Sequence, residues 1–293
     1  MNTISREQMI EMVKDTRTKV TNAPVSKEEL EAFPVIMTTL HIPTRVGDAL
    51  VYHSRTEKPE HSDVLIINLH GGGFIRERTP NDELFCRKLN HVVGCQVMDV
   101  DYRIAPEYPY PTAVYESYDV IQWLFEHHEE YGVNPQKIIL MGHSAGGNLA
   151  LTAVMRANAE HTFKPLALIC EYPPLDLYTD PADKPRRGKG IPAERARLYN
   201  LFYCDREHQK EPYASPVYAL DEQLTGFPPT LFVTAGMDDL CTEAENIALR
   251  MARNGNEITI KRFPGAAHAF TIYRKEGYKE GFELAPKPSA MPC

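Results

Sequence analysis

The sequence contains no long apolar run and no excess of positive charge. Nowhere do about eighteen apolar residues follow one another, which is roughly the length that a membrane-spanning helix requires. The N-terminal residues carry charges throughout and lack the apolar centre of a secretory signal peptide. The formal net charge of −8 disfavours phosphate backbones and anionic lipid surfaces. We therefore expect a cytoplasmic protein that binds neither nucleic acid nor membranes.

The cysteines form no C-x-x-C pair, which argues against a zinc knuckle and against a dense disulfide framework. We interpret them as buried or idle thiols in a reducing compartment. The stretch at 127–130, His-His-Glu-Glu, lacks the H-E-x-x-H spacing of a metal site and fits a solvated helix end. We expect no metal and no organic cofactor. The six cysteines are Cys86, Cys95, Cys170, Cys204, Cys241 and Cys293.

Apolar strand patterns instead alternate with amphipathic helical patterns. The order predicts a mostly parallel sheet of about eight strands with helices on both faces, which is the α/β class. Two strands that flank the turn at Gly47-Asp48 form a predicted hairpin. The predicted strands are 35–42, 49–55, 64–69, 95–102, 138–142, 166–172, 230–236 and 257–263. The predicted helices are 81–92, 113–130, 145–159, 192–202 and 243–254.

A Pro-rich, charged segment interrupts this alternation between Pro173 and Pro229. Long insertions after a sheet strand often act as lids or binding loops. We therefore predict a catalytic core of residues 35–172 and 213–293 and a small cap of residues 173–212. The N-terminal segment 1–34 is expected to join the cap as a surface helix and linker. The basic residues Lys184, Arg186, Arg187 and Lys189 are interpreted as a solvated loop of the cap.

The sequence Gly142-His143-Ser144-Ala145-Gly146 matches the G-x-S-x-G motif between a predicted strand and a predicted helix. Such a sharp turn strains the backbone at the serine and leaves space only for small flanking residues. The alternative is a cluster of small residues that packs a strand on a helix, with the serine as a helix N-cap. The strand–turn–helix context favours a nucleophilic serine.

A second glycine motif, His70-Gly71-Gly72-Gly73-Phe74, follows the predicted strand 64–69. Backbone N–H groups stabilise the negative charge that develops on an ester carbonyl oxygen during nucleophilic attack. We predict an oxyanion hole formed by the loop Gly71, Gly72 and Gly73, in which the N–H groups of Gly72 and Gly73 act together with that of Ala145. The alternative, a phosphate-binding loop, fits these residues less well, because the G-x-G-x-x-G spacing is absent.

Three motifs follow one another in a family-specific order: HGGGF at 70–74, DYRIAPEYPYP at 101–111 and GHSAGGN at 142–148. With the later stretches SPVYALDEQLTGFPPTLFVTAGMDDL and FPGAAHAF, the chain resembles the hormone-sensitive lipase family of esterases, which have the α/β-hydrolase fold, over about residues 35–281. That family most often carries an acidic residue at the position of His143 and commonly a glycine near Glu77. The histidine at position 143 instead resembles the residue found there in other α/β-hydrolases, including acetyl-sugar esterases and formamidases.

In the α/β-hydrolase fold the nucleophile is followed in the chain first by the acid and then by the histidine. Of the later histidines, His161 ends a predicted helix and His208 lies in the cap, whereas His268 lies where the family's catalytic histidine stands. Asp238 follows the strand 230–236 and matches the first aspartate of the family's D-x-L motif. Asp239 is the alternative acid.

These assignments predict a serine carboxylesterase that prefers short acyl chains, from acetyl to about hexanoyl. The residues expected at the substrate pocket are Phe74, His143, Tyr199 and Phe202. A deacetylase or amidase acting on sugar acetates, formamides or small peptides is an alternative with the same site. A ligand-binding protein that has lost catalysis, as in the plant gibberellin receptors that resemble this family, is another. The predicted edge strand 257–263 suggests a homodimer contact.

Overall fold

The computed structural model describes residues 4–18 and 24–282. The other positions, which include Cys293 and parts of the predicted segments 1–34 and 213–293, lie outside the described residues. Within the described chain an eight-stranded sheet has the order β1-β2-β4-β3-β5-β6-β7-β8. The strands are β1 (Ile36–Ile42), β2 (Ala49–Arg55), β3 (His61–Leu69), β4 (Cys95–Asp101), β5 (Ile138–His143), β6 (Ala167–Glu171), β7 (Thr230–Ala235) and β8 (Ile258–Phe263).

The sheet is antiparallel only at the edge formed by the first two strands, β1 and β2. β1 pairs with β2, and β2 pairs with β4, in antiparallel register, whereas all pairings from β4 to β8 are parallel. The carboxyl ends of β3, β5, β6, β7 and β8 therefore meet at one edge, where ligands bind in such sheets. The predicted hairpin and the mostly parallel α/β sheet are both confirmed.

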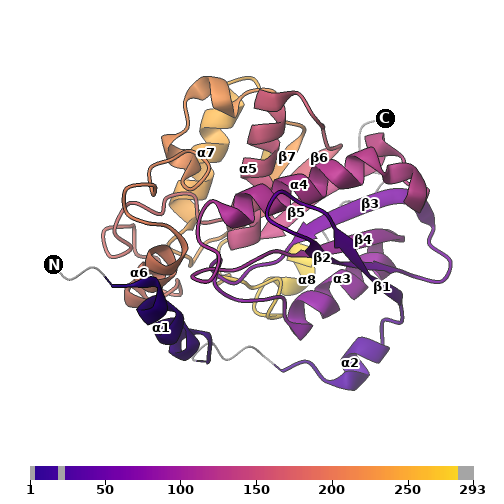
Figure 1. The fold of residues 1–293 in the computed structure, drawn as a ribbon, viewed down its shortest axis with the longest axis horizontal. Helices are drawn as coiled ribbons and strands as arrows, with labels where there is room; N and C mark the ends of the chain where they lie inside the picture. Colours follow the sequence, from indigo (N-terminus) through magenta and orange to yellow (C-terminus); the bar gives the residue numbers. More distant parts are fainter. Residues whose placement is uncertain (1–3, 19–23, 283–293) are drawn as a thin grey trace.

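Helices cover both faces of the sheet (Figure 1). The described helices are α1 (Arg6–Thr18), α2 (Lys27–Glu31), α3 (Pro80–Val93), α4 (Thr112–Glu126), α5 (Ala145–Glu160), α6 (Ala193–Tyr203), α7 (Cys241–Arg253) and α8 (Tyr278–Phe282), with short 3-10 turns at His128–Tyr131, Pro135–Lys137, Pro216–Tyr218 and Asp221–Leu224. Buried side chains of α4, α5 and α7 form the core on one face, and those of α3 and α8 form it on the other.

One helix boundary of the prediction is corrected. The helix expected at 113–130 ends at Glu126, because a 3-10 turn follows and Gly132 closes it in the left-handed conformation. The insertion 173–212 contains the predicted helix as α6. The described cysteines are free and buried, as interpreted from the sequence. In the part of the chain that the structure describes, every helix is too short or too polar to cross a membrane.

The basic stretch of the insertion is only partly the solvated loop that we expected: Arg186 and Lys189 are exposed, whereas Lys184 and Arg187 are not. Lys184 is 8% exposed and forms an ion pair with Glu243 at 2.6 Å. Arg187 donates to the Thr242 hydroxyl at 2.9 Å through its side chain and to Asp239 at 2.6 Å through its backbone N–H. These contacts fasten the insertion to the start of α7, so a charged sequence here serves packing rather than solvation.

The N-terminal helix α1 is also more than a surface helix. It lies beside α6, as Figure 1 shows. Val13 is fully buried, and Arg17 forms an ion pair with Glu107 at 2.7 Å. The same guanidinium donates to the carbonyl oxygens of Ile75 and Ala105. Through these contacts α1 is connected to the chain that follows the glycine loop.

Candidate active site

Ser144 lies at a sharp turn between β5 and α5, with φ 53° and ψ −121°. A side chain at Gly142 would place a Cβ 2.3 Å from the Gly146 carbonyl oxygen, and one at Gly146 would place it 1.9 Å from the carbonyl oxygen of Leu69. Neither position has room for a methyl group. The two glycines of the motif are therefore required by close approach, and the strained serine is held at the carboxyl edge of the sheet.

The serine hydroxyl begins a chain of hydrogen bonds. Ser144 Oγ lies 2.9 Å from His268 Nε2, and His268 Nδ1 lies 2.6 Å from Asp238 Oδ2. The Asp238 side chain is fully buried, whereas the His268 side chain keeps 14% exposure. The loops that carry the two residues are joined, because the Met237 N–H donates to the Ala266 carbonyl at 3.0 Å. The structure thus brings together the three residues that were predicted far apart in the sequence.

Asp239, the alternative acid, has other partners. Its carboxylate accepts from the backbone N–H of Arg187 at 2.6 Å and pairs with the guanidinium of Arg186 at 3.3 Å. Among the described residues, His161 and His208 form no contact with the serine; His161 caps α5, and His208 pairs with Glu211.

The glycine loop lies beside the serine and borders the same cavity. Gly72 and Gly73 have φ values of +128° and +62°, a region that side chains rarely adopt. Among the described residues, none of the hydrogen bonds engages the backbone N–H groups of Gly72, Gly73 or Ala145. These donors are therefore available to a ligand. A Cβ at Gly71 would lie 3.5 Å from the Cβ of Ser144, so this part of the loop lies against the serine.

Buried polar contacts support the loop from behind. The ring of His70 stacks on Tyr102 at 4.3 Å, its Nδ1 lies 2.6 Å from the Gly71 carbonyl oxygen, and its Nε2 lies 3.4 Å from Asp101. Burial alone lowers the pKa of His70, but the hydrogen bond and charge of Asp101 and of nearby carboxylates raise it overall. His70 and Asp101 thus hold the loop, as expected from the sequence.

Arg103 also has the bracing role that its position suggested. Its side chain pairs with the buried Glu116, and its guanidinium donates to the carbonyl oxygen of Asp48 at 3.1 Å. The segment after β4 is thereby tied to α4 and to the hairpin turn.

His143 precedes the serine and forms a second buried pair. Its Nε2 lies 3.0 Å from Asp82 Oδ1, and both residues are almost fully buried. Thr79 is the N-cap residue of α3 and donates to Asp82 Oδ2 through its backbone N–H at 2.8 Å. Although burial alone would raise the pKa of Asp82, the hydrogen bond and charge of His143 hold it well below its usual range. This pair connects the start of α3 to the end of β5.

The carboxyl group of Glu171 lies buried at the end of β6, next to His143 in the sheet. Its backbone carbonyl accepts from the Ser144 N–H at 2.8 Å, and its carboxylate accepts from the Thr271 hydroxyl at 2.5 Å. Burial raises the pKa of Glu171. The residue therefore links the serine turn to the segment that follows His268.

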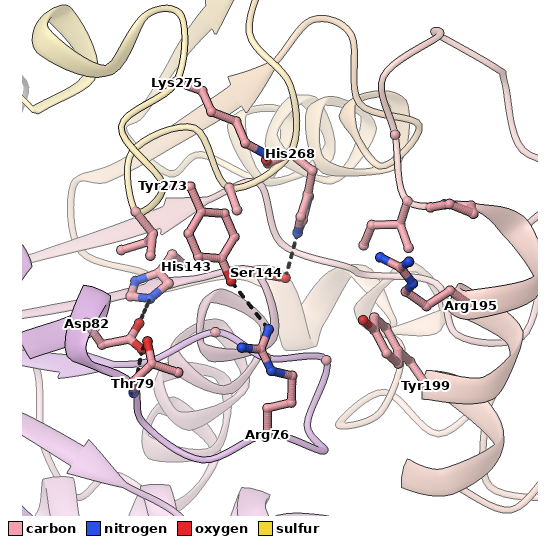
Figure 2. A pocket seen from close by; sticks show the side chains of 18 of the residues that line it. Arg76, Thr79, Asp82, His143, Ser144, Arg195, Tyr199, His268, Tyr273 and Lys275 are labelled. Carbon is pink, nitrogen blue, oxygen red and sulfur yellow. Dashed lines mark hydrogen bonds and ion pairs between the residues drawn. The ribbon is translucent and has the colours of Figure 1, made fainter. Parts of the chain in front are cut away.

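Ser144 opens into a cavity of about 340 Å³ (Figure 2). A smaller cavity of about 40 Å³ meets it at the serine. Gly73, Ser144, Ile191 and Tyr199 border both spaces. The large cavity is bordered by several charged side chains, among them Arg76 and Arg195. The exposed lining of the small cavity is mainly apolar and includes Phe74, Leu177 and Leu240, although the charged residues Asp176, Lys184, Asp238 and Asp239 also border it.

The predicted pocket residues fall into two groups. His143 and Tyr199 line the large cavity, and Phe74 lines the small one. Phe202 is 1% exposed and packs in the core, and it is not among the residues around either cavity. The last turn of α6 docks on the core there, because the Tyr110 N–H donates to the Tyr203 carbonyl at 2.7 Å.

The sequence reasoning missed several residues of the large cavity. Arg76, Asp82, Arg195, Tyr273 and Lys275 all line it. Asp82 had a local signal, since Thr79-Pro80-Asn81-Asp82 has the spacing of a helix-capping box directly after the glycine loop. The others converge from three distant segments and had no such signal.

Comparisons with known proteins agree with this geometry. A family model described as alpha/beta hydrolase fold matches residues 66–272. An arylesterase of Saccharolobus solfataricus is 31% identical over 209 residues, covering 70% of this chain and 68% of that protein. An acetyl esterase of Salmonella schwarzengrund is 29% identical over 244 residues, covering 81% and 74%.

Solved structures show the same relationship. The hyperthermophilic esterase of the archaeon Pyrobaculum calidifontis superposes with a TM-score of 0.80 at 26% identity, covering 98% of each chain. The matched region contains the glycine loop, the serine turn and the loop of His268. The chain therefore belongs to the α/β-hydrolase family, as its resemblance to the esterases of the hormone-sensitive lipase family implied.

Proposed function

We propose that this protein is a serine carboxylesterase that hydrolyses esters of short-chain acids. The observation that carries the proposal is the hydrogen-bonded series Ser144–His268–Asp238 at the mouth of a cavity, with distances of 2.9 and 2.6 Å. A serine hydroxyl is a poor nucleophile unless a base removes its proton and a third group orients that base. The similarity to proteins named arylesterase and acetyl esterase supports the same reaction class.

In this mechanism Ser144 Oγ attacks the ester carbonyl carbon while His268 Nε2 accepts its proton. Asp238 holds the ring by its Nδ1–H and stabilises the imidazolium that forms. The carbonyl oxygen gains negative charge and is met by the N–H groups of Gly72, Gly73 and Ala145. Collapse expels the alcohol, which takes the proton from His268 and leaves an acyl-enzyme. A water molecule, activated by His268, then releases the acid and restores the serine.

The small cavity supports the preference for short acyl chains. Its volume of about 40 Å³ corresponds to roughly three water-sized groups, since one water needs about 10–15 Å³ on the same measure. An acyl chain of about two to four carbons fits such a space. The lining by Phe74, Leu177 and Leu240 suits an alkyl chain.

Residues 173–212 and 1–34 form a cap over this site in our proposal. The support is that α6 contributes Arg195 and Tyr199 to the cavity and that α1 contacts α6. The core of residues 35–172 and 213–293 carries the reacting groups. The cap then contributes substrate selection, and the core contributes the chemistry.

Two experiments test the esterase proposal. A fluorophosphonate probe is expected to label the wild-type protein and to leave Ser144→Ala unlabelled, because the probe needs an activated serine. The p-nitrophenyl ester series is expected to give the highest kcat/KM between acetate and butyrate. Labelling that persists in Ser144→Ala would reject the nucleophile, and a kcat/KM that rises steadily to the longest soluble chain would reject the acyl-site assignment. A wild-type protein that neither reacts with the probe nor hydrolyses esters would favour the non-catalytic ligand-binding alternative.

We further propose that two copies associate through β8. This strand lies at the edge of the sheet, and an edge strand offers unpaired backbone groups to a second strand. Light scattering at micromolar concentration tests the proposal directly: a dimer mass is expected, and a monomer mass would contradict it.

A further inference from the structure

The large cavity has the opposite sign of charge to the protein as a whole. The formal net charge of the chain is −8. The cavity is nevertheless lined by four cationic side chains, Arg76, Lys189, Arg195 and Lys275, and by two carboxylates, Glu77 and Asp82. A positive cleft in an acidic protein concentrates anions locally. The positive charge at the cavity therefore indicates a role in binding an anionic substrate.

Neither carboxylate forms an ion pair with these four cations within the described chain, and the cations remain in excess. Asp82 is already held by His143 and Thr79. Glu77 is exposed, and within the described chain no ion pair engages it. Lys189 lies 3.7 Å from Glu276, in a pair that is more than half exposed on both sides. Lys275 is exposed and lies over the Tyr273 ring, whereas Arg76 and Arg195 are half-buried. The two arginines are therefore the more enclosed cations of the cavity.

Arg76 is held in place from both ends. The turn at Gly72 folds the chain back, so that a Cβ there would lie 2.9 Å from the Cβ of Arg76. The guanidinium donates to the Tyr273 hydroxyl at 3.4 Å across the cavity (Figure 2). The residue is half-buried, and no carboxylate among the described residues pairs with it. An arginine in this state retains unused N–H donors.

Arg195 approaches from the opposite wall, on the cap helix α6. It too is half-buried and has no carboxylate partner in the described part of the chain. Tyr199 lies one turn further along α6, and Figure 2 shows its ring beside Arg195, on the wall that faces Arg76. Burial raises the pKa of Tyr199, and the positive charges of Arg195 and Arg76 oppose that rise, so both guanidinium groups act on the tyrosine hydroxyl.

The two cavities can hold the two parts of an ester substrate, the acyl chain and the alcohol. Both begin at Ser144, where the acyl carbon and the leaving alcohol must separate. The small apolar cavity receives the acyl chain under the proposed function. The alcohol part must then occupy the large cationic cavity, between Arg76 and Arg195.

We propose that the preferred substrates are short-chain esters whose alcohol part carries a carboxylate, which Arg76 and Arg195 bind. This inference rests on the proposed esterase function and adds the chemical class of the leaving group. Arginine suits the role because its planar guanidinium meets a carboxylate through two parallel hydrogen bonds. A guanidinium without a protein carboxylate in a half-closed site gains more from such a partner than an exposed lysine does.

Two acetate esters of equal size test the inference: 3-acetoxybenzoate, which is anionic, and 3-acetoxybenzamide, which is neutral. The wild-type kcat/KM is expected to be about tenfold or more higher for the benzoate. Arg76→Gln and Arg195→Gln are each expected to lower kcat/KM for the benzoate about tenfold and for the benzamide less than threefold. The product 3-hydroxybenzoate is expected to inhibit the wild type more strongly than 3-hydroxybenzamide does, and both substitutions should weaken that inhibition.

Arg197→Gln is the matched control. It removes the same charge from the same helix, but Arg197 pairs with Asp180 at the surface and does not line the cavity. It should leave the benzoate-to-benzamide ratio unchanged. Equal kcat/KM for the two esters in the wild type, or equal losses for both in the arginine variants, would overturn the inference while leaving the esterase intact. Failure to hydrolyse either ester, with Ser144 unlabelled by fluorophosphonate, would overturn the proposed function itself.

Discussion

Two histidine–carboxylate pairs lie beside Ser144, and they differ in what the second ring nitrogen contacts. His268 uses Nδ1 for Asp238 and presents Nε2 to the serine hydroxyl at 2.9 Å. His143 uses Nε2 for Asp82, and its Nδ1 is buried without a hydrogen-bond partner in the described chain.

The exposure of the two pairs differs as well. The His268 side chain is 14% exposed and the His143 side chain 2%. A base must exchange protons with the substrate and with water, which requires both a free nitrogen and access to the cavity. His268 meets both conditions, since its Nε2 contacts Ser144 and its side chain is partly exposed. His143 borders the cavity, but its side chain and its unpaired Nδ1 are buried, and its pair with Asp82 holds two elements together. A histidine beside a carboxylate is thus not by itself a sign of catalysis.

Matched substitutions of the two histidines should give the largest difference in kcat between the two pairs. His268→Gln is expected to lower kcat by roughly 10⁴-fold or more, because it removes the proposed base. His143→Gln keeps a hydrogen-bond donor near Asp82 and is expected to lower kcat less than about tenfold. Hydrolysis of p-nitrophenyl acetate measures both. Comparable losses in the two variants would show that His143 takes part in proton transfer and that the comparison is wrong.

Removing the negative charge of Asp238 should have the next largest effect. In Asp238→Asn the ring of His268 loses the partner that orients it and stabilises its charged form. A fall in kcat of about 10³–10⁴-fold is expected, with little change in KM. Asp82→Asn serves as the control and should stay within about tenfold of the wild type. A mild Asp238→Asn phenotype would instead favour Asp239 as the acid.

The smallest effect concerns stability and its dependence on pH. Because the folded-state pKa of Asp82 is lowered, its carboxylate stabilises the fold above the unfolded-state pKa, and this contribution is lost as pH falls. Asp82→Asn is expected to lower the free energy of unfolding by about 2 kcal/mol at neutral pH. The gap between the two proteins should narrow in acid, below about pH 4. Denaturant unfolding at several pH values measures it, and a gap independent of pH would count against this account.

The local patterns of the sequence were sufficient for the fold and for the proposed nucleophile. Strand, helix and turn signals each depend on neighbouring residues, so β5, Ser144 and α5 were predictable from the stretch 138–160. The chain order of the fold then selected Asp238 and His268. The hydrogen bonds from Ser144 to His268 and from His268 to Asp238 are long-range contacts, and the family resemblance supplied what spacing alone did not.

Contacts made by the cap were not predictable in the same way. Lys184 looked solvated because its partner, Glu243, comes from the far side of the insertion. Arg76 and Tyr273 are 197 positions apart in the chain, and each lies in a stretch without a motif. Phe202 belongs to an apolar patch on α6, yet composition did not reveal which end of the patch faces the core. These placements depend on tertiary packing, which a one-dimensional pattern does not encode.

The close approach of Gly146 to the backbone of Leu69 limits how the specificity of this protein can be changed. Since no methyl group fits between Gly146 and the carbonyl oxygen of Leu69, helix α5 and the strand that leads to the glycine loop are in direct backbone contact. The serine turn and the start of the glycine loop are therefore packed against each other with no side chain between them. Selectivity can be adjusted from the opposite wall, where α6 supplies side chains and none of the proposed reacting atoms. Redesign of α6 can thus change which alcohols enter while the alignment of the reacting atoms stays intact.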